Sequence, residues 1–63
     1  MNRQEMEKLA EQLNQDESVE NARVVEFLGK PHVHVDLESG DIEVITSDGE
    51  SHFIPIHTST RKQ

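Results

Sequence analysis

The sequence predicts an α+β fold in which one N-terminal amphipathic helix packs on a four-stranded antiparallel β-meander. Two observations indicate this fold. Apolar residues near the N-terminus recur at helical spacing, and from Ala22 onward the period changes to two, with turn residues every eight to ten positions. Because strands joined by short turns pair with their neighbours, the apolar stripe of the helix is expected to cover one face of a meander.

The helix is predicted over residues 3 to 14. Asn2 and Glu5 have the spacing of a capping box, in which each side chain accepts a hydrogen bond from the other residue's backbone amide. The residues that follow place one apolar stripe at positions i, i+3, i+4 and i+7: Met6, Leu9, Ala10 and Leu13. Residues 15 to 21 are mostly polar and break this stripe, so they are predicted to be a connector.

Four strands are predicted after the connector, at residues 22–28, 32–38, 41–47 and 50–56. Asp48-Gly49 is the strongest turn signal, because both positions of a two-residue type I′ hairpin need positive φ. Ser39-Gly40 is a weaker signal of the same kind, and Gly29-Lys30-Pro31 suits a three-residue connection. Residues 1–57 are therefore expected to form a single domain, and residues 58–63 a disordered C-terminal tail.

Turn length fixes which residues face each other across the sheet. These turns would place Val35 opposite Val44, and Val44 opposite Phe53. The predicted helix-covered face consists of Val25, Phe27, Val33, Val35, Leu37, Ile42, Val44 and Phe53. A three-residue loop at residues 47–49 would instead turn the other side of the last strand toward the helix.

The opposite face is then predicted to be an interaction surface. It would carry Val24, Leu28, His34, Ile45, His52 and Ile54. Several aliphatic side chains on one exposed face of so small a domain favour a protein contact, and a two-fold homodimer is the commonest form of such a contact. A chain of 63 residues without cysteine also has few other means of adding stability.

The charge distribution indicates what kind of partner the chain has. Its formal net charge is −7, which argues against direct contact with nucleic acid or an anionic membrane and favours a basic protein partner. Residues 31–60 contain no lysine or arginine. The acidic residues of that segment form a candidate patch: Asp36, Glu38, Asp41, Glu43, Asp48 and Glu50. This patch is interpreted either as a solvated surface or as a mimic of DNA phosphates that inhibits a nucleic-acid-binding protein.

The histidines allow a second hypothesis, a metal site. His32 and His34 are two residues apart on a predicted strand, and imidazole nitrogens two apart project from one face. The candidate ligands are His32, His34, His52 and His57. The alternatives are ordinary solvent-facing histidines, or a pH sensor in which protonation offsets the surrounding carboxylates.

The sequence shows no arrangement typical of catalysis. Its three glycines are isolated at turns and form no phosphate-binding loop, and its serines lie in no nucleophile-elbow context. The predicted function is a non-enzymatic regulatory, accessory or inhibitor protein that needs no cofactor. The lack of an apolar run of membrane-spanning length and of a signal peptide favours a cytoplasmic location.

Overall fold

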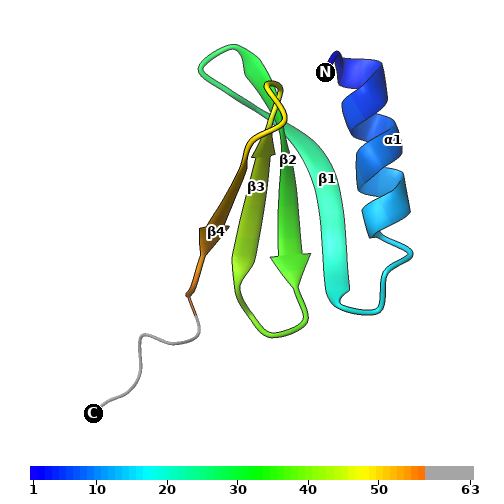
Figure 1. Ribbon diagram of the computed structural model, residues 1–63, viewed down its shortest axis with the longest axis vertical. Coiled ribbons are helices and arrows are strands. Elements are labelled where there is room, and N and C mark those ends of the chain that lie inside the picture. The colour runs from blue at the N-terminus through cyan, green and yellow to red at the C-terminus, as the bar shows by residue number, and fades with distance from the viewer. Residues whose placement is uncertain (57–63) are drawn as a thin grey trace.

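The computed structural model describes residues 1–56 and confirms the predicted α+β fold (Figure 1). One helix precedes a four-stranded antiparallel sheet whose strands lie in chain order. The elements are α1 (Arg3–Leu13), β1 (Val19–Phe27), β2 (Lys30–Leu37), β3 (Ile42–Thr46) and β4 (Ser51–Ile54). The proposed tail, residues 58–63, lies outside the described residues. The described part of the chain contains no helix with the length and apolar character needed to cross a membrane.

The capping box forms as the sequence predicts. The Asn2 side chain accepts a hydrogen bond from the Glu5 amide at 2.8 Å, and the Glu5 carboxylate accepts one from the Asn2 amide at 3.0 Å. These two bonds satisfy amides that the first helical turn leaves without an intrahelical partner. The helix therefore begins at Arg3, and Asn14 caps its other end.

The hydrophobic core lies between α1 and the first two strands. Met6, Val33 and Val35 have no solvent-exposed area. The other buried apolar residues are Ala10, Val19 and Ala22. The helix packs on β1 and β2 alone among the described strands, so β2 holds the centre of the core and β3 and β4 extend beyond the helix.

A short hydrogen-bonded turn joins the helix to the sheet. The Asp16 carboxylate accepts hydrogen bonds from the Ser18 amide at 2.9 Å and from the Ser18 hydroxyl at 2.8 Å. These two bonds favour the charged carboxylate, so they lower the pKa of Asp16. A lowered pKa in the folded state contributes stability that is complete above the unfolded pKa and disappears as the pH falls through the folded value.

The connection between β1 and β2 is shorter than predicted. Phe27 pairs with Lys30, so only Leu28 and Gly29 form the loop. Both residues have positive φ, 55° and 78°, as a type I′ turn requires. Leucine is a poor residue for this turn, which explains why the sequence did not indicate it.

The other two turns are one residue longer than predicted. In the β2–β3 turn, Leu37 donates to the Asp41 carbonyl and Gly40 donates to the Leu37 carbonyl, both at 2.9 Å. In the β3–β4 turn, Thr46 donates to the Glu50 carbonyl and Gly49 to the Thr46 carbonyl, again at 2.9 Å. Each is a three-residue loop whose last residue is a glycine with positive φ, a common hairpin with a glycine bulge.

These turn lengths correct the predicted faces of two strands. Val24 pairs with Val33, and Val33 with Ile45, so Val24 and Ile45 lie on the helix side of the sheet and pack against the core. The predicted pairs of Val44 with Val35 and with Phe53 are wrong. Glu43 pairs with both of these residues instead. The predicted helix-facing residues that instead lie on the opposite side are Val25, Phe27, Ile42 and Val44.

Asn14 fastens the end of the helix to the outer edge of β1. Its side-chain nitrogen donates to the Ala22 carbonyl at 2.8 Å, and its side-chain oxygen accepts from the Ala22 amide at 2.7 Å. The amide group of Asn14 thus takes the place of a neighbouring strand at one residue of β1.

We expect Asn14→Ala to lower the free energy of unfolding by about 1–3 kcal/mol, because it leaves the Ala22 amide and carbonyl without their partner in a partly buried site. Urea unfolding followed by circular dichroism measures this change. Asn21→Ala, an exposed change in the same strand, is the control and should have little effect. Equal stability of the two variants would contradict the role given to Asn14.

We expect Leu28→Asn to raise the free energy of unfolding by roughly 1 kcal/mol, since asparagine tolerates positive φ better than leucine. Leu28 is 85% exposed, so the change removes little packing within the chain. The measurement is a urea midpoint at low protein concentration. A fall in stability would show that Leu28 makes a contact that outweighs its backbone strain.

Candidate functional site

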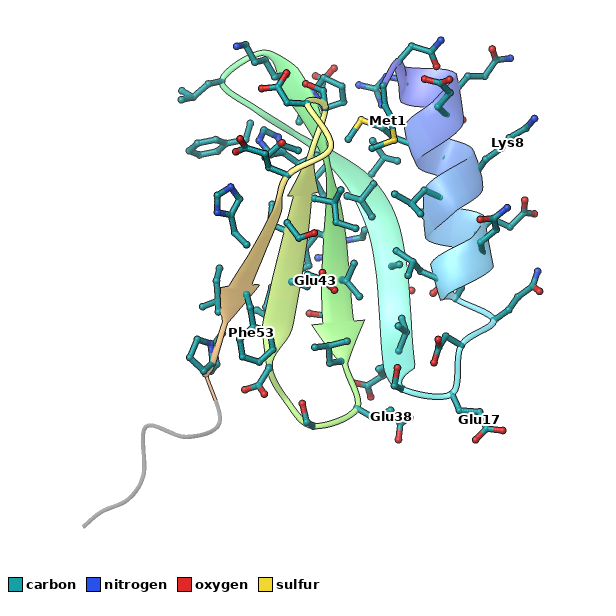
Figure 2. All side chains as sticks on the ribbon, in the orientation of Figure 1. Met1, Lys8, Glu17, Glu38, Glu43 and Phe53 are labelled. Carbon is teal, nitrogen blue, oxygen red and sulfur yellow. The ribbon has the colours of Figure 1, made fainter. Side chains whose placement is uncertain are left out.

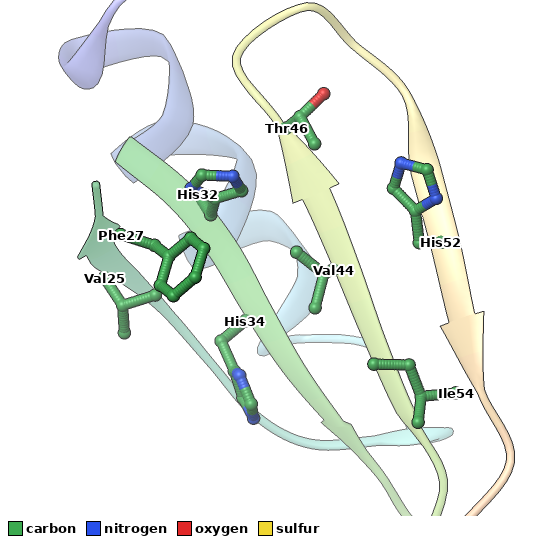
Figure 3. Close-up of a pocket in the computed structure, with 8 residues that line it drawn as sticks. All are labelled: Val25, Phe27, His32, His34, Val44, Thr46, His52 and Ile54. Carbon is green, nitrogen blue, oxygen red and sulfur yellow. The ribbon is translucent and has the colours of Figure 1, made fainter. Parts of the chain in front are cut away.

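The candidate site is the face of the sheet opposite the helix, which we call the open face. It forms a hollow of about 590 Å³ (Figure 3). The residues that line it come from all four strands: Val25, Phe27, His32, His34, Val44, Thr46, His52 and Ile54. Aliphatic and aromatic carbon dominates this lining, and three imidazoles supply nearly all its polar atoms.

The three histidines stand in two neighbouring cross-strand rows. His34 pairs with Val44, which pairs with His52, so Val44 separates the two imidazoles. His32 lies in the next row, opposite Thr46. Residues two strands apart are roughly 10 Å from each other, too far to share one metal ion.

Within residues 1–56, no three histidine or acidic side chains come together in a way that could hold a metal ion. His57, the fourth candidate ligand, lies outside the described residues. The geometry therefore gives the metal hypothesis no support in the part of the chain that the structure describes.

His34 belongs to a short chain of polar contacts at one end of the open face. Its Nε2 lies 3.2 Å from one oxygen of Asp36, and Arg23 donates to the other oxygen at 3.2 Å. Arg23 and Asp36 therefore neutralise each other's charge. Because both groups are partly exposed, we expect the ion pair to contribute little to stability.

The other two imidazoles have different neighbours. The Nδ1 of His32 donates to the Lys30 carbonyl at 3.1 Å, and the ring meets Phe27 edge to face at a centroid distance of 6.1 Å. His52 is more exposed and lies 3.6 Å from the Glu50 carboxylate. While the imidazoles are neutral, the lining of the hollow carries no formal charge.

The structure places only part of the predicted interaction surface on the open face. His34, His52 and Ile54 line the hollow. Leu28 projects from the β1–β2 turn at one end of the sheet. Val24 and Ile45 are a correction: they pack against the core on the helix side, because the turn lengths reverse the faces of β1 and β3.

The acidic residues do not form one continuous patch. Asp36 lies on the open face beside Arg23, whereas Glu43 lies on the helix side, opposite Val35. Asp41 is buried and accepts a hydrogen bond from the Ser39 hydroxyl. The other three lie in the two turns at opposite ends of β3: Glu38, Asp48 and Glu50. The six positions therefore lie on different parts of the fold, and the DNA-mimic hypothesis stays a prediction.

Sequence reasoning missed several residues of the open face. Val25, Phe27 and Val44 were predicted to face the helix, and His32 and Thr46 were not assigned to the interaction surface. The alternation of valine and histidine along β2 did indicate which side of the sheet the histidines face. Val33 and Val35 belong to the core, so His32 and His34 must project from the other side.

Comparison of the chain with protein-family models, with curated proteins and with solved structures found no match. The chemistry of the open face is therefore the basis for any statement about function.

Proposed function

We propose that this chain is a small non-enzymatic protein-interaction module that forms a homodimer through its open face. The observation that carries this proposal is an apolar hollow, lined by no carboxylate, lysine or arginine, on one face of an otherwise acidic domain. Val25, Val44 and Ile54 lie in the hollow, where water wets them in a single copy. Taking such a side chain from full exposure to full burial is worth about 1.5–3 kcal/mol, so each of these partly exposed residues would contribute a fraction of that.

The distribution of charge supports a second copy as the occupant. Two chains with a net charge of −7 repel each other wherever their acidic surfaces meet. The open face reduces this repulsion, because Asp36 is paired with Arg23 and the lining residues include no carboxylate. Glu50 lies at its rim, beside His52. Two copies can therefore approach on this face with less like charge brought together than on the acidic surfaces.

The size of the face indicates the strength of the dimer. All four strands pair over a stretch of about five residues, so the open face covers roughly 19 by 17 Å. This is less than the ~800 Å² per partner of a standard-size interface. We therefore expect a reversible dimer with a dissociation constant in the micromolar range.

The strained turn at Leu28 also supports the proposed homodimer. Leu28 has a φ of 55° and is 85% exposed, so in a single copy it gains nothing that offsets its backbone strain. Phe27, beside it, is 63% exposed and lines the hollow. A partner resting on the open face would cover this apolar tip and give the leucine a packing role.

We expect Ile54→Asp to weaken the dimer roughly tenfold or more, because it places a carboxylate in the contact of both copies. Phe53→Asp is the matched control, since it adds the same charge one residue away on the other side of β4. Sedimentation equilibrium over a range of protein concentrations measures both variants against the native chain. A native chain that stays monomeric at millimolar concentration overturns the proposal.

A further inference from the structure

A second surface of the molecule, on the helix side of β3 and β4, is only partly covered. We call it the β3–β4 strip and define it by Glu43, Ile45, Ser51 and Phe53. These residues share the helix side of the sheet, where Glu43 pairs with Phe53 and Ile45 with Ser51. Figure 2 labels Glu43 and Phe53 on their neighbouring strands. Phe53 is 58% exposed, because α1 packs on β1 and β2 and does not extend to β4.

The strip has the width of one helix. A four-stranded sheet spans about 19 Å. A helix with its side chains is roughly 10 Å across, so it covers two strands. α1 fills the half of the layer above β1 and β2 and leaves the other half without a partner. A second helix beside α1 would complete a two-layer arrangement.

Glu43 indicates the charge of that helix. It stands in a cross-strand row between Val35 and Phe53, a position where the pattern of a covered sheet calls for an apolar side chain. It is only partly exposed, and within residues 1–56 its carboxylate has no ion-pair or hydrogen-bond partner. Desolvating an anion without a cation is unfavourable, so a helix that covers Glu43 must supply a lysine or arginine.

The residues around the strip are negatively charged, as Glu43 is. Glu38 lies in the turn at one end of β3, and Asp48 and Glu50 lie in the turn at the other end. Residues 38–56 include no lysine or arginine. A second copy does not fit, because its own α1 carries three glutamates against one arginine and one lysine. We propose that the β3–β4 strip docks a cationic amphipathic helix of another protein, with an apolar stripe on Phe53 and Ile45 and a basic residue on Glu43.

The test uses a synthetic helical peptide with leucines at i, i+3, i+4 and i+7 and lysines along both sides of this stripe. Fluorescence anisotropy of the labelled peptide measures binding to the native chain, and the same peptide with glutamates replacing the lysines is the control. We expect binding at micromolar concentration by the lysine peptide and none by the glutamate peptide. No binding of the lysine peptide at up to millimolar protein overturns the proposal.

Two pairs of variants test where the peptide binds. Phe53→Ala should weaken binding roughly tenfold through lost apolar contact, whereas Ile54→Ala, its neighbour on the open face, should leave binding unchanged. Glu43→Gln should weaken binding about fivefold or more, whereas Glu17→Gln, in the α1–β1 connector, should not. Equal effects within either pair would mean diffuse attraction between opposite charges and would overturn the proposal.

Backbone amide NMR shifts give an independent location for the bound peptide. Changes concentrated in β3, β4 and the facing side of α1 support the strip, and changes concentrated at Val25, His34 and Val44 contradict it. Phe53→Asp separates this proposal from the homodimer, because it should abolish peptide binding and leave self-association intact. Loss of self-association in Phe53→Asp would mean that a second copy occupies the strip, which overturns the proposal.

Discussion

The packing of Met6 on Val33 and Val35 is the contact on which the rest of this small structure depends. All three side chains are completely buried, and they join the helix to the central part of β2. Once the two valines face the helix, the alternation of β2 directs His32 and His34 to the opposite side. The open face and its imidazoles are thus a direct consequence of the core.

The sequence predicts the elements better than their pairing. The helix with its capping box and the order of the four strands were predictable because periodicity and capping are local properties. Which side of β1 and of β3 faces the helix was not predictable, because it depends in each case on the length of one turn. Gly40 and Gly49 have positive φ in the observed three-residue loops, but a glycine is equally suited to a two-residue turn. Leu28 gave no signal of a turn at all, since its positive φ is unusual for leucine.

The two surfaces that the helix leaves uncovered differ in their charge. The hollow of the open face has neutral lining residues, whereas the β3–β4 strip contains Glu43 and has acidic turns at both ends. Because α1 covers only β1 and β2, β4 has an exposed apolar residue on each side, Phe53 and Ile54. The two surfaces therefore differ in the partner that we propose for each, an identical chain for the open face and a cationic helix for the strip.

Asn14 has a consequence for how sheets of this protein can join edge to edge. Its side chain occupies the outward amide and carbonyl of Ala22, so another strand can add to β1 only by displacing it. β4 is the other edge of the four-stranded sheet. Two molecules that met along β4 would each present a blocked β1 at the outside, and a third could not add in the same way. Edge pairing through β4 would then stop at a pair of molecules, and growth of the sheet beyond it would require a strand to displace Asn14 from β1.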